Sequence, residues 1–259
     1  MTGEEAANPA ASRVLVVIPT YNEVENLPVI VARIRAAVPA AHVLVADDAS
    51  PDGTGKLADG MAEDDDHVRV LHRPGKRGLG AAYLDAFGWG LREGFGVLVE
   101  MDADGSHQPE QLPSLLARID AGADVVLGSR WIPGGTVQNW PLARSVLSRG
   151  GNTYVRIVLG MPVRDATGGF RAYRATALQA LDLGDVASQG YCFQVDLVWR
   201  AVRAGLRVEE VPITFVERER GESKMNRAIV GEALWRVTQW GVRRRAEQVA
   251  SALRARPGR

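Results

Sequence analysis

The chain has 259 residues, of which 46% are hydrophobic and 24% are charged, close to the averages of globular proteins. This composition excludes a fibrous or wholly disordered protein, and the length suits one large domain with a substantial core. With 31 basic and 31 acidic residues the formal net charge is zero, so no global positive field would recruit nucleic acid, and we expect no nucleic-acid partner.

The first segment, Met1 to Ser12, is polar and acidic and predicts a flexible tail without the features of a secretory signal. The single cysteine, Cys192, excludes an intramolecular disulfide and suits a reducing compartment. No stretch approaches the roughly 18 uninterrupted apolar residues of a membrane-spanning helix, so we expect any membrane contact to be peripheral.

Short apolar runs then alternate with longer helical patterns. The runs predict strands at Val14 to Ile18, Val43 to Ala46, Val68 to Leu71, Val97 to Met101 and Asp124 to Leu127. Helices are predicted at Glu25 to Val38, Gly53 to Glu63, Gly78 to Glu93 and Pro109 to Ala121. This alternation predicts a mainly parallel α/β sheet with helices on both faces. In the usual strand order 3-2-1-4-5, the first and fourth strands are neighbours where ligands bind.

After Leu127 the alternation stops. Residues Gly128 to Val163 mix glycine, proline, tryptophan and arginine around one helical pattern, Leu142 to Leu159, which predicts a substrate-binding insertion. A further small α/β element is expected from strand-like and helical patterns at Phe170 to Tyr173, Phe193 to Ala204 and Val208 to Val211. The chain ends in a tryptophan-bearing helical pattern with Arg243-Arg244-Arg245, at Ala228 to Leu253, which predicts an amphipathic basic helix.

Two carboxylates, Asp102 and Asp104, follow the fourth predicted strand one residue apart. Such a pair can hold a hard divalent cation, which usually shares its remaining coordination positions with water and substrate phosphates. Acidic residues after a strand also form turns or cap the next helix. The triplet alone therefore leaves a metal site and a structural turn both open.

The loops after the first two predicted strands also carry polar side chains. Tyr21 could stack on a nucleotide base, while Glu23 and Asp48 could accept hydrogen bonds from a base or ribose. Turn formation and helix capping compete with these roles, and they are favoured for Asp47 and Asp52.

Cationic side chains occur in three places that suit anion binding. Arg130 follows the fifth predicted strand, Arg144 opens the next helix, and a late loop carries Arg218, Arg220 and Lys224. Arginine binds phosphate with two parallel hydrogen bonds, whereas lysine acts as a point charge. The alternative for any one of them is a solvated surface cation, and the position of Arg130 at the sheet edge favours it most.

Several separated motifs together resemble a known enzyme family. Val17 to Glu23, Ala46 to Gly53 and Met101 to Asp104 are similar to motifs of the inverting family 2 glycosyltransferases of GT-A fold. Gly128 to Arg130, Pro133 to Pro141 and Arg220 to Lys224 resemble the polyprenol (dolichol) monophosphomannose synthase group within it. The order and number of these motifs make the resemblance more specific than any single motif.

The resemblance implies a Rossmann-like GT-A domain over residues 13–224, between a tail over residues 1–12 and an amphipathic basic C-terminal segment over residues 225–259. It also implies transfer of mannose from GDP-mannose to a polyprenyl (dolichyl-type) phosphate with inversion, using Mg²⁺ or Mn²⁺. We therefore expect a cytoplasmic enzyme that lies peripherally on the cytoplasmic face of a membrane, where a transmembrane partner protein could anchor it.

Site residues follow from the resemblance position by position. The guanosine-binding positions of the family match Pro19, Tyr21, Glu23, Ala46 and Asp48, and its donor and metal positions match Asp102, Ala103 and Asp104. Its phosphate-binding positions match Arg130, Arg218 and Lys224, and the acceptor phosphate is expected at Arg144 and Ser148. The residues expected to carry catalysis are Asp102, Asp104, Arg130 and Arg144.

One departure from the family concerns the metal. Archaeal members carry Leu-Gln after the aspartate pair, whereas this chain has Gly105-Ser106. The third protein ligand is therefore expected to be Ser106 or to be replaced by water, with His107 or Gln108 as alternatives.

A phosphate monoester is mostly dianionic near pH 7 and is already a nucleophile, so this reaction needs no general base. A hydroxyl acceptor would need one, and Asp165 stays open for that role beside a structural one. Two other functions remain open: a UDP-glucose:polyprenyl-phosphate glucosyltransferase, and a non-catalytic nucleotide-binding membrane scaffold.

Overall fold

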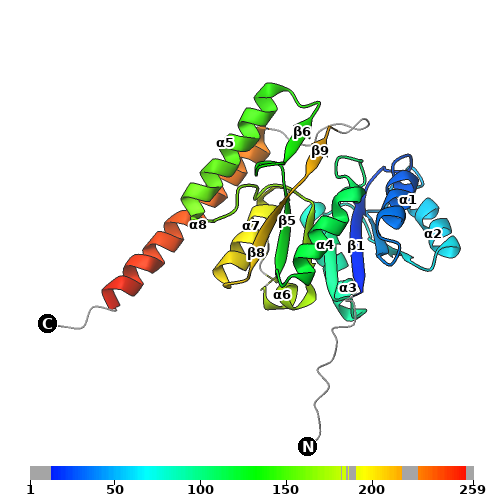
Figure 1. Ribbon diagram of the computed structural model, residues 1–259, viewed down its shortest axis with the longest axis horizontal. Coiled ribbons are helices and arrows are strands. Elements are labelled where there is room, and N and C mark those ends of the chain that lie inside the picture. Colours follow the sequence, from blue (N-terminus) through cyan, green and yellow to red (C-terminus); the bar gives the residue numbers. More distant parts are fainter. Residues whose placement is uncertain (1–12, 182, 185, 187–190, 218–226, 255–259) are drawn as a thin grey trace, which may run out of the picture.

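The structure is a computed structural model that describes residues 13–181, 183, 184, 186, 191–217 and 227–254. Seven strands form its central sheet in the order β3-β2-β1-β4-β7-β5-β8 (Figure 1). The strands are β1 Val14–Thr20, β2 His42–Asp47, β3 Val68–His72, β4 Val97–Glu100, β5 Val125–Ser129, β7 Arg171–Arg174 and β8 Val208–Pro212. All pairings are parallel except those of β7, which runs antiparallel to both β4 and β5.

Helices cover both faces of this sheet. They are α1 Leu27–Ala37, α2 Thr54–Asp64, α3 Leu79–Arg92, α4 Leu112–Asp120, α5 Leu142–Leu159, α6 Ala175–Ala180, α7 Tyr191–Arg203 and α8 Arg227–Arg254, with a 3-10 turn at Pro109–Gln111. The parallel α/β architecture with helices on both faces is therefore confirmed, and the predicted helices are present with ends that differ by a few residues.

Alternation along each strand explains the two layers of helices. In β1, Leu15 and Val17 face a core formed with α3, α5 and α7, while Val16 and Ile18 face a second core formed with α1 and α4. Successive side chains of a strand point to opposite faces, so a continuous apolar run buries both. The strands β1, β2, β4 and β5 consequently contain runs of consecutive apolar residues.

The sequence-based topology was correct for β1 and β4, which are neighbours, but wrong beyond β4. The strand predicted to follow β4 in the sheet, β5, is separated from it by β7, and β7 and β8 belong to the main sheet instead of a separate element. The reason is burial: Ala172 and Tyr173 of β7 pack into the two opposite cores. A small separate element could not bury both faces of this strand.

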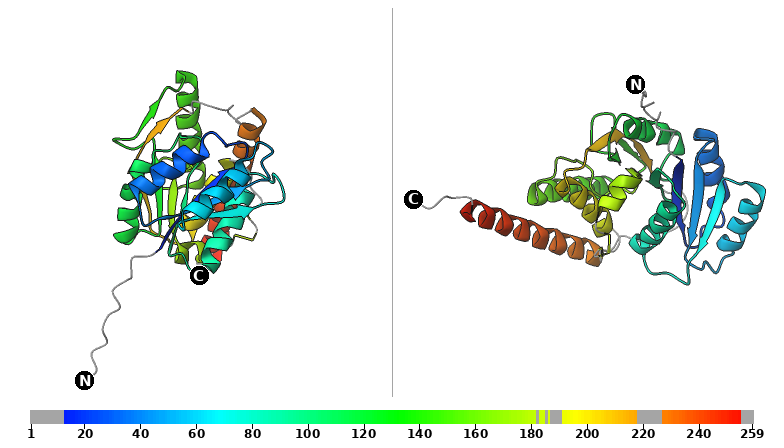
Figure 2. Two further views of the ribbon diagram at one scale, coloured as in Figure 1. Left: turned by 90° about the vertical axis from the view of Figure 1, so that its right-hand side faces the viewer. Right: turned by 90° about the horizontal axis from the view of Figure 1, so that it is seen from below.

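Two long helices and a second, short sheet complete the fold. β6 (Thr136–Gln138) pairs in parallel with β9 (Thr214–Val216), a pairing that no sequence pattern predicted. The final helix α8 lies along α5 (Figures 1 and 2), where Tyr154 Oη lies 2.6 Å from Thr238 Oγ1. Gly241 permits this approach, since a Cβ there would lie 2.5 Å from Val158 Cγ1.

The predicted C-terminal helix is thus present, while its amphipathic character stays a prediction. Val237 is buried, but Trp235 and Val242 are exposed, so apolar side chains occur on more than one side of α8. In the ranges that the structure describes, we find no helix with the length and apolar character needed to cross a bilayer.

Candidate active site

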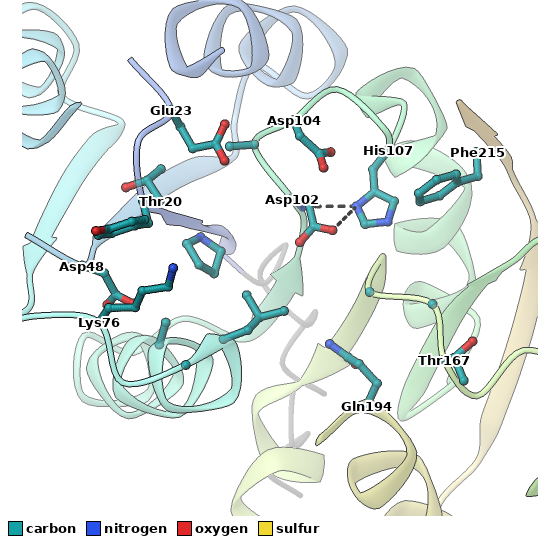
Figure 3. Close-up of a pocket in the computed structure, with 18 of the residues that line it drawn as sticks. Thr20, Glu23, Asp48, Lys76, Asp102, Asp104, His107, Thr167, Gln194 and Phe215 are labelled. Carbon is teal, nitrogen blue, oxygen red and sulfur yellow. Dashed lines mark hydrogen bonds and ion pairs between the residues drawn. The ribbon is translucent and has the colours of Figure 1, made fainter. Parts of the chain in front are cut away.

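A cavity of about 310 Å³ lies at the carboxyl ends of the central strands (Figure 3). This is the edge at which parallel α/β sheets bind ligands. Its walls come from the end of β1, the loops after β2 and β4, the start of α3, the insertion around α5, the turn before β7, α7 and β9. Segments far apart in the sequence therefore meet in one site.

Most of the site residues expected from the sequence line this cavity: Pro19, Tyr21, Glu23, Asp48, Asp102, Ala103, Asp104, Arg130 and Arg144. Three others do not line it. Ala46 is buried in the core of the sheet, Ser106 is 1% exposed, and Ser148 lies one helical turn after Arg144 on α5. The predicted phosphate ligands Arg218 and Lys224 lie outside the described residues.

One side of the cavity combines an aromatic ring with carboxylates. Lys76 Nζ lies 4.1 Å from the centre of the Tyr21 ring, and Asp48 is nearby on the same side (Figure 3). Asp48 forms an ion pair with Arg73, yet burial raises the pKa of its carboxyl above the ordinary value. Glu23 points into the cavity, and its Oε2 accepts a hydrogen bond from Asn26 Nδ2 at 2.8 Å.

Two neighbouring aspartates have the structural roles that the sequence favoured. Asp47 accepts hydrogen bonds from the Thr20 hydroxyl and from the amide and hydroxyl of Ser50. Asp52 accepts three, from the amide and hydroxyl of Thr54 and the amide of Val24. Burial alone would raise the pKa of Asp52, but these hydrogen bonds together lower it. Both side chains shape the loops that carry Tyr21 and Asp48.

The aspartate pair projects from the loop after β4 (Figure 3). The Asp102 amide donates a hydrogen bond to His107 Nδ1 at 3.2 Å, and Asp102 Oδ2 lies 3.9 Å from the same nitrogen. Asp104 Oδ1 accepts a hydrogen bond from the Ser106 amide at 3.0 Å. His107 is 1% exposed and stacks on Phe170. The histidine thus fixes the loop conformation.

The donor set of this loop fits a magnesium-like ion held partly by substrate. Asp102 and Asp104 supply carboxylate oxygens at the cavity, while no group of three or more His, Cys, Asp or Glu side chains in the described chain could hold a metal. Mg²⁺ is commonly held by one or two carboxylates together with waters and phosphates. Ser106 Oγ is buried and has no hydrogen-bond partner among the described residues, and Ser106 as a ligand stays a prediction.

Arg130 is held by a buried aspartate. Its Nε and Nη2 each lie 2.7 Å from an oxygen of Asp165, and Nη2 also donates to Thr167 Oγ1 at 3.0 Å. Burial alone would raise the pKa of Asp165, but the ion pair with Arg130 lowers it. Since both Asp165 oxygens accept hydrogen bonds from Arg130, this carboxylate orients the arginine and is not placed to act as a general base.

Aromatic rings surround the two arginines of the cavity. The Arg130 guanidinium carbon lies 5.5 Å from the centre of the Trp140 ring and 5.4 Å from that of Phe215, and the Arg144 guanidinium carbon lies 4.1 Å from the Trp140 ring. Arg144 also forms an ion pair with Glu217. Cations stacked on aromatic faces are restrained in position while they keep their charge. We call Arg130, Arg144, Trp140 and Phe215 the arginine–aromatic wall.

A buried polar network supports the floor of the cavity. Gln194 lines the cavity and donates from Nε2 to Glu100 Oε2 at 2.7 Å. Arg171 faces Glu100 across the β4–β7 pair and donates to the carbonyls of Gly168, Gln194 and Ala166. Burial raises the pKa of Glu100 to about 7, although Arg171 acts in the opposite direction.

Sequence reasoning missed several lining residues, namely Thr20, Trp140, Thr167, Gln194 and Phe215. The insertion around Trp140 was recognised as a substrate-binding segment, but its ring had no assigned role. Gln194 and Phe215 come from α7 and β9 and reach the cavity only through tertiary packing. No local pattern around them distinguishes them from ordinary helix and strand residues.

Comparisons with known proteins agree with this geometry. The profile of the family described as Glycosyl transferase family 2 matches residues 15–182. The chain is 58% identical over 243 residues to a polyprenol monophosphomannose synthase of Mycolicibacterium smegmatis, covering 93% of this chain and 92% of that one. It is also 58% identical over 246 residues to an undecaprenyl-phosphate mannosyltransferase of Micrococcus luteus, covering 95% and 99%.

Solved structures share the fold at low sequence identity. Glucosyl-3-phosphoglycerate synthase of Mycobacterium tuberculosis, in complex with Mn²⁺, UDP and glucosyl-3-phosphoglycerate, matches with a TM-score of 0.63 and 19% identity, over 87% of this chain and 77% of that one. The same enzyme with phosphoglyceric acid matches with a TM-score of 0.64 over 90% and 80%. From the family profile and the close relatives together, the chain belongs to glycosyl transferase family 2 and is a glycosyltransferase.

Proposed function

We propose that this enzyme transfers mannose from GDP-mannose to the phosphate of a polyprenol, with inversion at the anomeric carbon and with Mg²⁺ or Mn²⁺. The observation that carries the proposal is the high identity, over nearly the whole chain, to two relatives whose names state mannosyl or polyprenol chemistry. The cavity supports it, because carboxylates and an aromatic ring line one side and the arginine–aromatic wall lines the other.

The carboxylate side suits a guanine nucleotide. The Tyr21 ring offers a flat aromatic surface on which a base can stack, and Lys76 against the ring adds positive charge. Glu23 and Asp48 offer acceptors for the N–H groups of guanine and the hydroxyls of ribose. Pro19 completes this wall, and Ala46 would act from within the sheet through its place beside β1.

The aspartate pair suits the donor diphosphate. Asp102 and Asp104 would hold the divalent ion, which when bound supplies Lewis-acid stabilisation of the departing diphosphate. His107 keeps the backbone of Asp102 in place, and the Ser106 amide orients Asp104. Arg218 and Lys224 are proposed to add positive charge to the same diphosphate.

The opposite wall suits the acceptor phosphate. Arg144 and Ser148 would bind it. Arg130, oriented by Asp165, would hold the acceptor phosphate and the donor in position for the reaction. A phosphate monoester is mostly dianionic near pH 7 and attacks without a general base. The engagement of Asp165 by Arg130 agrees with a mechanism that uses positioning and charge stabilisation alone.

The lipid part of the proposed acceptor supports a site of action at a membrane. Leu142, Val146 and Ile157 on α5 are exposed, and Trp235 and Val242 on α8 are exposed as well. Exposed apolar side chains beside basic residues are typical of helices that lie on an anionic lipid surface. We propose peripheral contact with the cytoplasmic face through residues 225–259 and α5, with the glycosyltransferase domain over residues 13–224, and a transmembrane partner as a further anchor.

The test is transfer of radiolabelled mannose from GDP-mannose to polyprenyl phosphate in detergent with Mg²⁺ or Mn²⁺. The wild type is expected to form lipid-linked mannose, Asp104→Ala to lose it, and Asp120→Ala, an exposed change on α4, to keep it. UDP-glucose serves as the control donor. Transfer of glucose in place of mannose would replace the proposed reaction by its glucosyl counterpart, and tight GDP binding without turnover would point to a non-catalytic module.

A further inference from the structure

The ion pair between Arg144 and Glu217 joins the arginine–aromatic wall to a residue that is distant in the sequence. Arg144 lies in the first turn of α5, and Glu217 directly follows β9. Arg144 lines the cavity, and the two side chains are only 18% and 25% exposed, so the pair is only partly screened by water. The arginine proposed to bind the acceptor phosphate therefore already holds an anion supplied by the protein.

The surrounding structure holds both partners in place. The Trp140 ring lies under the Arg144 guanidinium at 4.1 Å. On the other side, the Glu217 amide donates to Gln138 O at 3.0 Å, which extends the short β6–β9 sheet by one residue. Neither the arginine nor the backbone of Glu217 needs to move for the carboxylate to leave, because rotation of the glutamate side chain is sufficient.

The arginine–aromatic wall has more N–H hydrogen-bond donors than the Glu217 carboxylate satisfies. Arg144 Nη1 donates to Glu217, whereas Arg144 Nε and Trp140 Nε1 are buried and have no acceptor among the described residues. Buried N–H groups of this kind usually have partners. A phosphate, with three acceptor oxygens and greater charge, would satisfy more of them than the glutamate does.

The charge of the acceptor changes during the proposed reaction. An acceptor oxygen bonds to the anomeric carbon, the bond from that carbon to the β-phosphate oxygen of GDP breaks, and GDP leaves with the electron pair. The acceptor arrives as a monoester of charge about −1.5 to −2 and leaves as a diester with one ionisable oxygen and charge about −1. Glu217 therefore competes with a stronger anion before the reaction and with an equal one after it.

We propose, resting on the proposed function, that Glu217 is an internal competitor for the acceptor phosphate. Its carboxylate occupies Arg144 until the monoester displaces it, and it recaptures Arg144 once the product carries a single charge. Glu217 in this way lowers the affinity of the acceptor site for anions and promotes release of the phosphodiester product. The alternative is that Glu217 only orients Arg144, and the two roles predict opposite effects on binding.

The experiment measures binding by calorimetry in the full-length protein, with citronellyl phosphate as the monoester probe and its methyl ester as the diester probe. Glu217→Gln is expected to tighten both by about tenfold, because the competing charge is gone while the side-chain shape is kept. Glu217→Asp should change both in the same direction but less. Glu209→Gln, which removes a carboxylate on β8 that pairs with Arg207 and Arg118, is the matched control and should leave both unchanged.

A double-mutant cycle shows whether the gain passes through Arg144. In an Arg144→Gln background, Glu217→Gln should give no gain in probe affinity. Weaker probe binding by Glu217→Gln, or a gain that persists without Arg144, would overturn the proposal. Mannose transfer is measured in parallel: transfer by the wild type with no change of affinity in Glu217→Gln refutes the competitor alone, whereas absent transfer with the expected change of affinity refutes the proposed reaction alone.

Discussion

Replacing Asp165 by asparagine should weaken the ion pair that orients Arg130 without changing the size of the buried side chain. Asp165 is fully buried and holds Arg130 through two hydrogen bonds of 2.7 Å. Removing one charge of a buried ion pair costs about 3–5 kcal/mol, and because the amide keeps one acceptor oxygen we expect about 3 kcal/mol. For a domain of this size that corresponds to a fall in melting temperature of about 6–12 °C.

The same change should also reduce catalysis. With its partner neutral, Arg130 loses the orientation that places it against the aromatic rings, and a small misplacement of a positioning group costs about 10- to 100-fold in rate. The assay is kcat for mannose transfer beside thermal melting. Asp59→Asn, which breaks an exposed pair with His72, is the matched control and should change both little.

The pH dependence gives an independent check on the ion pair. Because the folded pKa of Asp165 is lower than the ordinary value, its stabilisation is present above that value and is lost as the pH falls through the folded pKa. The difference in melting temperature between wild type and Asp165→Asn should therefore shrink below about pH 4. If Asp165→Asn melts like the wild type at neutral pH and transfers mannose at the same rate, the positioning role assigned to Asp165 is wrong.

Three further changes test other parts of the structure. Glu100 has a folded pKa of about 7, above its unfolded value, so the wild-type protein loses stability as the pH rises from about 4.5 to 7. Glu100→Gln has no charge to bury, and it should gain stability relative to wild type across that range, by up to about 3 kcal/mol in melting experiments. Gly241→Ala should destabilise the packing of α8 on α5 by about 1–3 kcal/mol, since its Cβ would lie 2.5 Å from Val158 Cγ1, whereas Gly231→Ala on the same helix has open space and should not destabilise. Lys76→Met should raise the Kd for GDP by about two- to fivefold in calorimetry through loss of the cation–π contact with Tyr21, and equal GDP affinity would remove Lys76 from the donor site.

The sequence was sufficient to predict that the residues after β1 and β4 meet at the cavity, because they follow strands with clear hydrophobic patterns. Asp102 and Asp104 follow β4, and Tyr21 and Glu23 follow β1. These two strands are neighbours in the sheet, as in the usual strand order 3-2-1-4. Local pattern and global topology agree here, so position in the sequence translated directly into position in space.

The rest depended on contacts that no local pattern encodes. The Arg171 side chain lies buried in a strand that pairs with β4 from about 70 residues away, and burial of an arginine depends on the carbonyl groups that happen to surround it. Ser106 follows the aspartate pair, but it is buried because the loop turns inward at Gly105, whose φ is 75°. Phe215 reaches the cavity through the β6–β9 pair, which consists of three residues on each side.

The short strand β9 carries Phe215 of the arginine–aromatic wall and also contacts the loop of the aspartate pair, so it joins two halves of the cavity that come from different parts of the chain. The cavity residues proposed for the donor all precede Gln108, and the arginine–aromatic wall is formed by residues after Ser129. The Val216 amide donates to the Ser106 carbonyl at 3.1 Å, so a backbone hydrogen bond joins the loop of the aspartate pair to the segment that carries Glu217. We expect that the half proposed for the acceptor can diverge among relatives, or be exchanged between them in chimeras, while the half proposed for the nucleotide stays intact, provided that this hydrogen bond is kept.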